Sequence, residues 1–186
     1  MPDPLPDPRP DPGLPEPLAG EDLETWSALA TVLEWLPPAL DRQLLRDAGL
    51  THFEYGILYA LAAAPERTLR MSTLATYANS SLSRLSRAAA RLERTDLVRR
   101  RPDPTDGRYT LAVLTGPGTR AMEAATPGHV RTVHALVLDR LTAAQKRQLR
   151  EISRRIVRAI GDGEGWEPPT DAGRSRPGTP RGPRLG

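Results

Sequence analysis

The chain contains no cysteine, only one lysine and no long apolar run. The missing cysteines exclude disulfides, cysteine-ligated zinc sites and thiol redox sensing. Because 25 of the 26 basic residues are arginine, the composition indicates a coding bias and is not by itself evidence for DNA binding. No stretch approaches the roughly 18 apolar residues of a membrane span, and the N-terminus lacks a signal peptide pattern. We therefore expect a cytoplasmic protein that does not contact a membrane.

Residues typical of catalytic and metal sites are also scarce. The sequence has no phosphate-binding loop, no cysteine nucleophile and no clustered pair of acids. Its histidines are His52, His129 and His134, and the last two are five positions apart, which does not place them on one helix face as the i, i+4 zinc pair requires. We predict no enzyme activity, no catalytic residues, no metal site and no cofactor.

Charge is unevenly distributed along the chain. Residues 1–22 hold one arginine against six acids, whereas residues 67–120 hold eleven arginines against four acids. Residues 121–160 hold eight basic residues against three acids. A segregated basic region is what a polyanion-binding surface requires, although a merely solvated basic face has the same composition.

Both ends of the chain are predicted to be disordered tails. Residues 2–18 contain eight prolines, and residues 161–186 are rich in proline, glycine and arginine. Such segments have little to bury. We therefore expect an acidic tail over residues 1–21, a second tail over 161–186, and one domain of about 140 residues between them.

Several helices are predicted between the tails. One should run over 22–36, be kinked or restarted by the prolines at 37 and 38, and continue to about 47. Thr51 and Glu54 form a capping-box pattern that opens a helix at 52, ending before 65. Ser72 is predicted to cap a short helix to 78, Asn79 to supply a left-handed turn, and Ser80 or Ser81 to cap a helix to about 95.

The helix expected over 81–95 has two contrasting faces. Leu85, Ala88, Ala89 and Leu92 share the packing face, and an arginine row projects from the other side: Arg84, Arg87, Arg91 and Arg94. A short helix, a tight turn and a polar-capped helix with such a row indicate a helix-turn-helix, although an isolated arginine-rich helix is usually only solvated.

A hairpin is predicted directly after this helix. Residues 97–101 and the alternating run 109–114 can pair, and the prolines and Asp106-Gly107 between them provide turn residues. A charged hairpin tip is often only a solvated loop. Here it follows a helix-turn-helix, so the combination predicts a winged helix.

These segments resemble the MarR (multiple antibiotic resistance regulator) family over roughly residues 24–160. The matching stretches are Leu69-Arg70-Met71-Ser72-Thr73-Leu74-Ala75, Ser83-Arg84-Leu85-Ser86-Arg87, Arg91-Leu92-Glu93, Leu97-Val98-Arg99-Arg100, Asp106-Gly107-Arg108 and Leu114-Thr115-x-x-Gly118. Asp96 stands where the family usually has glycine, and aspartate tolerates the left-handed conformation better than most residues. The fold class implied is mostly α with a small β-wing: a winged helix-turn-helix domain plus N- and C-terminal dimerisation helices.

The resemblance and the residues together predict the contacts with double-stranded DNA. Ser81, Ser83, Arg84 and Arg87 are expected in the major groove, where arginine reads guanine. Arg108, held by Asp106, is expected in the minor groove. Phosphate contacts are expected from the base of the wing, which carries Arg99, Arg100 and Arg101.

The C-terminal region is predicted to return to helix after Thr115. Pro127-Gly128 should interrupt this helix, and Thr142 with Gln145 forms a second capping-box pattern before a helix with Leu149, Ile152, Ile156 and Ile160 on one side. Family resemblance implies that the terminal helices interlock with those of a second subunit, so we expect a homodimer and a pseudo-palindromic operator. The expected divisions are 22–50 and 116–160 for dimerisation and 51–115 for DNA binding.

Two hypotheses for function follow. The first is a homodimeric transcriptional regulator, a repressor tuned by a small aromatic or phenolic effector. The expected effector pocket contains Trp26, His52, Tyr55 and Tyr59, although aromatics at helical spacing often only pack the core. The alternative is a winged-helix module that binds protein instead of DNA.

Overall fold

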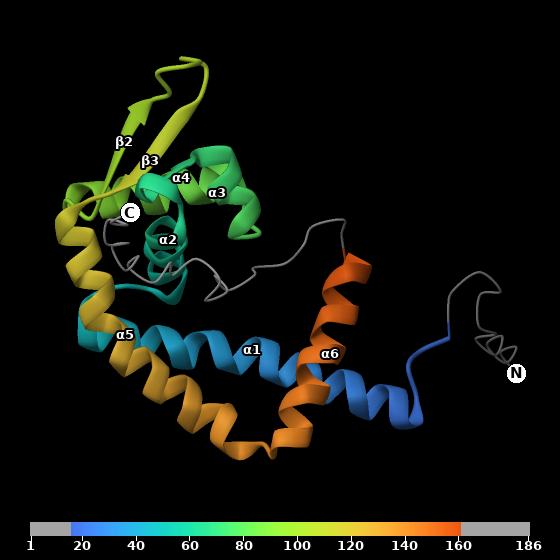
Figure 1. Cartoon of the computed structure of the whole chain (residues 1–186). Coiled ribbons are helices and arrows are strands. Elements are labelled where there is room, and N and C mark those ends of the chain that lie inside the picture. Colours follow the sequence, from blue (N-terminus) through green and yellow to red (C-terminus); the bar gives the residue numbers. More distant parts are fainter. Residues whose placement is uncertain (1–15, 161–186) are drawn as a thin grey trace, which may run out of the picture. The chain divides into compact units, whose positions relative to one another are not determined.

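The computed structural model describes residues 16–160. Within this range the chain is mostly helical with one small sheet, so the predicted fold class is confirmed. The helices are α1 (Gly20–Ala48), α2 (His52–Ala63), α3 (Met71–Tyr77), α4 (Leu82–Arg94), α5 (Gly116–Leu136) and α6 (Ala143–Ile160), and the strands are β1 (Thr68–Arg70), β2 (Val98–Pro102) and β3 (Thr110–Leu114) (Figure 1). Short 3-10 helices cover Pro65–Arg67 and Leu138–Arg140. Residues 1–15 and 161–186 of the predicted tails lie outside the described range.

The chain divides into two compact units between Ala39 and Leu40, and α1 runs through the boundary. Pro37 and Pro38 lie inside α1, which continues as helix past them. The predicted restart is therefore wrong, because each proline removes only one backbone donor and the flanking turns keep theirs. α1 ends at Ala48 and is followed by Gly49, whose φ of 66° is a left-handed value that glycine adopts without strain. The predicted division into segments 22–50, 51–115 and 116–160 is a division by role and stays a prediction.

α2 begins as the sequence predicts. Thr51 accepts a hydrogen bond from the backbone N–H of Glu54, and the Glu54 carboxylate accepts one from the backbone N–H of Thr51. This capping box satisfies two N–H groups that the helix itself leaves free. Ile57, Leu58 and Leu61 then lie in the main core.

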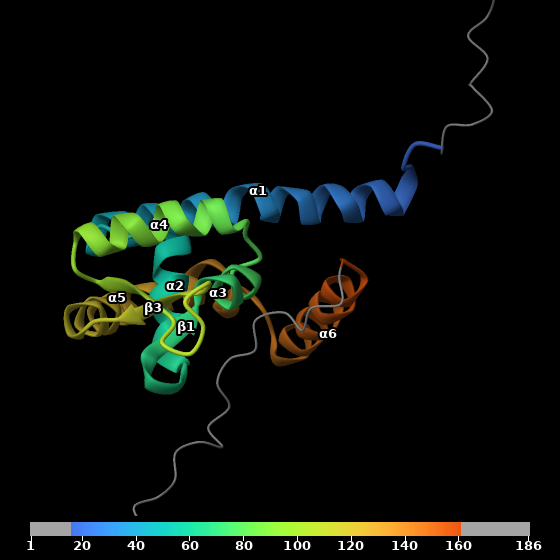
Figure 2. The ribbon, with the colours of Figure 1, turned by 90° about the horizontal axis from the view of Figure 1, so that it is seen from above.

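α3 and α4 form the helix-turn-helix (Figure 2). Ser72 does not cap α3 as predicted, because it already lies inside the helix, which begins at Met71. Arg70 occupies the N-cap position, and its side chain forms no capping hydrogen bond. Asn79 takes the expected positive φ, 41°, in the turn. Ser81 caps α4, accepting from the backbone N–H of Arg84 at 3.3 Å.

The sheet has the strand order β1-β3-β2, with both neighbouring pairs antiparallel. Val98 pairs with Leu114 at the base of the wing, and Pro102 pairs with Thr110 toward its tip. The tip projects beyond the helices (Figure 1). β1 has only three residues and is absent from the sequence prediction, because so short a run carries no alternation of its own.

α5 runs without a break through Pro127 and Gly128, so the predicted interruption is wrong. Its first turn lies against the end of the α4–β2 connection, because a Cβ on Gly118 would lie 2.0 Å from the Leu97 carbonyl oxygen. Thr142 and Gln145 bond reciprocally ahead of α6, which confirms the second capping box. No residue of α6 is buried.

Candidate nucleic-acid interface and effector cavity

α4 packs into the core by one stripe and presents polar residues elsewhere. Leu85, Ala89 and Leu92 are almost fully buried, whereas Ser81, Ser83 and Arg87 are exposed. The hydroxyl oxygens of Ser81 and Ser83 lie 3.1 Å apart at the N-terminal end of the helix. A recognition helix offers base contacts from this end.

The four arginines of α4 fall into two pairs. Arg84 lies over the Phe53 ring, 4.5 Å from its centroid, and Arg91 forms an ion pair with Glu54. Phe53 and Glu54 both belong to α2, so this pair of arginines lies on the flank of α4 that faces α2. Each residue advances about 100° around a helix, which places Arg87 and Arg94 opposite the buried stripe. Within residues 16–160 these two side chains form no ion pair, and both are exposed.

Glu54 is the buried acid of this arrangement, with a side chain only 3% exposed. Burial opposes ionisation, but hydrogen bonds from Arg91 and from Thr51 outweigh it and lower the pKa of Glu54. The charged carboxylate therefore holds the N-terminus of α2 against the last turn of α4. The capping-box pattern identifies Glu54 as a cap, but nothing in the sequence indicates its contact with Arg91.

The tip of the wing carries the predicted charge-assisted pair. Nη2 of Arg108 lies 2.7 Å from Oδ2 of Asp106, and Nε lies 3.0 Å from Oδ1. The hydrogen bond from the Arg108 side chain is the largest cause that lowers the pKa of Asp106. The Arg108 side chain remains 84% exposed, so Asp106 orients a guanidinium that is still free to enter a groove.

The three arginines at the base of the wing differ in their partners. Arg99 and Arg101 are exposed, and neither forms an ion pair within residues 16–160. Arg100 binds Glu93 of α4 through its backbone N–H and its guanidinium, at 2.8–2.9 Å. Arg100 therefore ties β2 to α4 in addition to its predicted role at phosphates.

Sequence reasoning missed a second anchor for the wing. Arg70, at the start of α3, donates to Asp103 at 2.8 Å and lies 4.3 Å from the centroid of the Tyr109 ring. Hydrogen bonds from Thr105, with that from Arg70, lower the pKa of Asp103 to about 2. The Asp103-x-Thr105 turn is visible in the sequence, but Arg70, the cation that binds Asp103, lies 33 positions earlier and no local pattern connects the two.

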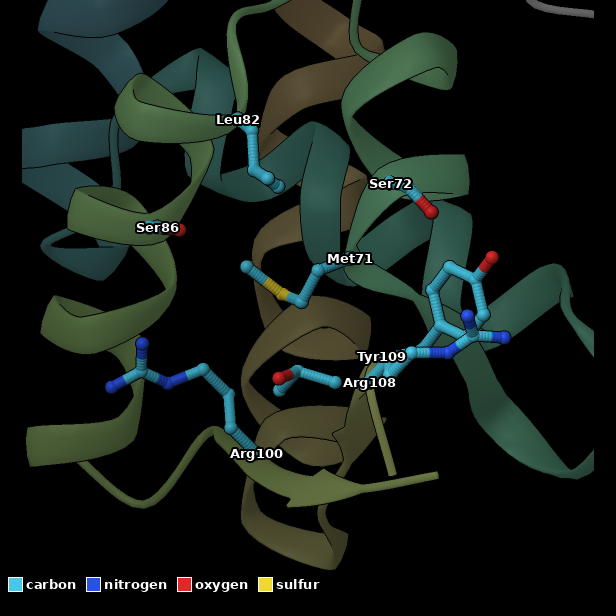
Figure 3. Close-up of a pocket in the computed structure, with 8 residues that line it drawn as sticks. Met71, Ser72, Leu82, Ser86, Arg100, Arg108 and Tyr109 are labelled. Atoms are coloured by element: carbon cyan, nitrogen blue, oxygen red, sulfur yellow. The ribbon is translucent and has the colours of Figure 1, made fainter. Parts of the chain in front are cut away.

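A cleft of about 190 Å³ separates α4 from the wing. Figure 3 shows Leu82 and Ser86 of α4 on the left, Met71 of α3 in the centre, and Ser72 of α3 on the right above Tyr109 and Arg108 of the wing. Arg100 of β2 lies at the lower left and extends toward α4. The walls thus carry two guanidinium groups and four hydroxyl groups beside apolar side chains. This chemistry suits a phosphate backbone that passes between a helix and a wing.

A second, larger cavity of about 690 Å³ lies among α2, α3 and α5. Three predicted effector residues, His52, Tyr55 and Tyr59, line it, and His129 joins them from α5. The Tyr55 and His129 rings are 4.7 Å apart, and Tyr55 Oη pairs with Thr126 Oγ1 at 3.0 Å. Trp26 belongs to the other unit of the chain and does not line this cavity.

The cavity is mainly apolar and its two central histidines are neutral near pH 7. Burial lowers the pKa of both His52 and His129, and the charge of His52 lowers that of His129 further. His129 Nδ1 is buried without a hydrogen-bond partner among residues 16–160. In the described part of the chain, no lysine or arginine lines the cavity.

The described residues offer neither a metal site nor a membrane span. Over residues 16–160 no group of three histidine, cysteine or acidic side chains is close enough to bind a metal ion. Within the same range, no helix combines the length and hydropathy needed to cross a membrane.

Comparisons with known proteins agree with this geometry. The MarR family model matches residues 48–108. Sco3205 of Streptomyces coelicolor, a MarR family transcriptional regulator solved in complex with DNA, is 42% identical, with a TM-score of 0.77 over 82% of this chain and 96% of its own.

Two further Streptomyces coelicolor structures are similar. AbsC, a MarR family transcriptional regulator, is 32% identical, with a TM-score of 0.74 over 78% of this chain and 98% of its own. PcaV, a transcriptional regulator solved with its natural ligand, is 26% identical, with a TM-score of 0.64 over 77% and 100%. A search of curated proteins finds no match. The winged helix, the arginine row of α4 and the identity to Sco3205 over almost its whole length show that this chain belongs to the MarR family of transcriptional regulators.

Proposed function

We propose that the chain acts as a homodimeric repressor that binds a pseudo-palindromic operator and responds to a small ligand. The observation that carries the DNA-binding part is the placement of two exposed arginines. Arg87 projects from α4 opposite its buried stripe, and Arg108 is held at the wing tip by Asp106. A helix in the major groove and a wing in the adjacent minor groove require cations at these two positions.

Each predicted DNA contact has a role in this proposal. Arg84 and Arg87 read guanine, and Ser81 and Ser83 contact bases or phosphates at the start of α4. Arg99, Arg100 and Arg101 contact phosphates beside the cleft. The position of α4 between the cleft and α2 supports these roles, and Sco3205 is a family member solved in complex with DNA.

The large cavity is the proposed effector site. Its apolar walls with a few polar groups are typical of small-molecule sites. Because no lysine or arginine between residues 16 and 160 lines it and both central histidines are neutral, the site favours an uncharged aromatic or phenolic molecule over a carboxylate. His52, Tyr55 and Tyr59 would contact this molecule, and a contribution from Trp26 stays a prediction. PcaV was solved with its natural ligand, which supports a ligand-responsive role.

Dimerisation is proposed from exposed apolar side chains at both ends of the described chain. Within α6, Leu149, Ile152, Ile156 and Ile160 are each more than one third exposed, and so are Leu23, Trp26 and Leu33 of α1. A second subunit would cover these side chains. We also propose that the chain has no enzymatic activity and works in the cytoplasm.

A mobility-shift assay tests the DNA-binding proposal. The full chain is titrated against the DNA upstream of its own gene and against a shuffled duplex of equal length and composition. We expect binding to the upstream DNA at least about a thousandfold tighter than to the shuffled duplex. Equal, weak binding to both duplexes would favour the alternative, a winged-helix module that binds protein.

A further inference from the structure

The first turn of α2 contacts both the large cavity and α4. His52 and Phe53 line the cavity. The Phe53 ring also contacts the Arg84 guanidinium, and the Glu54 carboxylate binds Arg91. The capping box between Thr51 and Glu54 fixes the conformation of this turn. One helical turn therefore joins a cavity wall to two arginines of the recognition helix.

Phe53 is the side chain that both lines the large cavity and contacts Arg84 of α4. Its ring is half-buried and packs against the main core, and the Arg84 guanidinium carbon lies 4.5 Å from the ring centroid. An arginine over an aromatic ring loses rotamer freedom but keeps its N–H edges available, because the contact uses only the face of the guanidinium. Arg84 is exposed, so those edges are open to a ligand such as a base.

We propose that Phe53 is a positioning residue for DNA reading, which holds Arg84 ready for its base and transmits the state of the cavity to it. The inference rests on the proposed function, in which Arg84 reads guanine. Pre-organisation lowers the entropy lost when the guanidinium binds a base edge. A change on the cavity side of Phe53 moves its ring, and the Arg84 guanidinium that lies over the ring moves with it.

This route has a distinctive consequence. The Phe53 ring contacts a base-reading arginine and not the phosphate-contacting arginines of the wing, so it should act on sequence discrimination alone. Non-specific affinity and the dependence of binding on salt come from phosphate contacts. Loss of the Phe53 ring should therefore leave both unchanged.

The test compares Phe53→Leu, Phe53→Tyr, Arg84→Ala and the double variant Phe53→Leu/Arg84→Ala in the full chain. Affinity is measured on the footprinted operator, on operators with single base-pair changes, and across a salt series. Arg84→Ala should reduce discrimination at one base pair about fivefold or more. Phe53→Leu should reduce it about two- to fivefold at the same base pair, Phe53→Tyr should retain it, and the double variant should match Arg84→Ala.

Gly56 allows the cavity link to be tested without a known effector. It lies one turn after Phe53, lines the cavity, and a Cβ added there meets nothing within 4 Å. Gly56→Leu places an apolar side chain beside the ring, and Gly56→Ala is its reference for the gain in helix propensity. Relative to Gly56→Ala, Gly56→Leu should change discrimination at the Arg84 base pair, and this change should disappear when Phe53 is leucine.

The outcomes separate this inference from the proposed function. If Arg84→Ala leaves discrimination intact, the base-reading role of Arg84 is wrong and the inference falls with it. If Arg84→Ala reduces discrimination but Phe53→Leu does not, or Phe53→Leu weakens all duplexes equally, only the inference is overturned. An equal effect of Gly56→Leu with and without the Phe53 ring, or no effect in either background, would reject transmission through Phe53.

Discussion

Single arginines of this chain differ in what holds them, and this decides what each can do. Arg91 is bound to the buried carboxylate of Glu54, and Arg100 is bound to Glu93, so both stabilise the fold of the lobe. Among residues 16–160, Arg108 forms an ion pair with its neighbour Asp106 alone, and it is largely exposed. Arg87 is exposed on the open side of α4. The last two are therefore available to DNA at little cost in stability.

Arg108→Ala should lower operator affinity mainly on sites with A·T-rich flanks. A narrow A·T minor groove has an enhanced negative potential, so removal of the inserted cation costs most there. Fluorescence anisotropy with A·T-flanked and G·C-flanked operators measures the difference. Arg120→Ala, an exposed arginine at the start of α5, serves as the matched control. Equal losses on both kinds of flank would place Arg108 at phosphates instead.

The cavity histidines should make the protein less stable in mild acid. Burial lowers the pKa of His52 and His129 below the ordinary 6.5, so below that pH the unfolded chain binds more protons than the folded chain. Their contribution to stability is fully present above pH 6.5 and is lost as the pH falls through their lowered folded values. In thermal unfolding measured between pH 8 and pH 5, the melting temperature should decrease once the pH is lower than about 6.5.

The double variant His52→Gln/His129→Gln tests the assignment. Asp41 accepts the His52 backbone N–H, and its charge raises the pKa of His52 without cancelling the effect of burial. In the double variant the slope between pH 6.5 and 5 should flatten, whereas His134→Gln is the matched control at an exposed histidine. An unchanged slope in the double variant would show that other groups cause the loss.

At the scale of elements, the connection between α4 and β2 lies directly against the start of α5. The Thr115 side chain caps α5 and donates a hydrogen bond to the Asp96 carbonyl at 2.6 Å, while Gly118 lies directly against Leu97. Asp96 itself adopts a φ of 56° at the end of α4, as the sequence predicts for the position where the family usually has glycine. This junction sets where β2 and β3 leave the helices.

Gly118→Ala should therefore destabilise the protein, although alanine favours helix over glycine. Its Cβ would lie 2.0 Å from the Leu97 oxygen, and the backbone must shift to accept it. We expect a loss of about 1–3 kcal/mol in the free energy of unfolding, measured by urea denaturation. Gly116→Ala, whose Cβ would meet only the tip of Arg120 at 3.6 Å, is the control and should cost far less. Equal stability of the two variants would contradict the close approach at Gly118.

Most local sequence signals that act within one turn predicted the elements well, and the expected Ser72 cap is the exception. The capping boxes at Thr51 and Thr142, the Ser81 cap and the Asn79 turn are all present. The predicted restart after Pro37-Pro38 and the predicted interruption at Pro127-Gly128 were wrong, because the remaining backbone hydrogen bonds keep those helices continuous.

Contacts between distant residues could not be predicted. Arg84 over Phe53, Arg91 on Glu54 and Arg70 on Asp103 join positions 31 or more apart, and no local pattern indicates which arginine meets which partner. For the candidate site, sequence reasoning therefore identified the residue types and their helix but not the division of α4 into a flank that faces α2 and a free side. The cavity residues His52, Tyr55 and Tyr59 were predicted, whereas His129 was considered only as a metal ligand.

At the scale of the whole molecule, we propose a two-fold dimer that reads DNA with α4 and the wing of each subunit. Two-fold symmetry would place equivalent recognition helices on equivalent half-sites. The distance between the two helices in the proposed dimer would therefore set the spacing of the operator half-sites. Exposed apolar residues of α6 provide the surface that a second copy would cover.

Hydroxyl-radical footprinting of the full chain on the DNA upstream of its own gene tests this claim most directly. The account predicts two protected half-sites of related, inverted sequence, with centres about 10–10.5 base pairs apart or a multiple of this, and additional minor-groove protection outside each half-site from Arg108. The Arg108→Ala protein should lose only that outer protection. A single protected half-site, or uniform protection without inverted symmetry, would contradict the account.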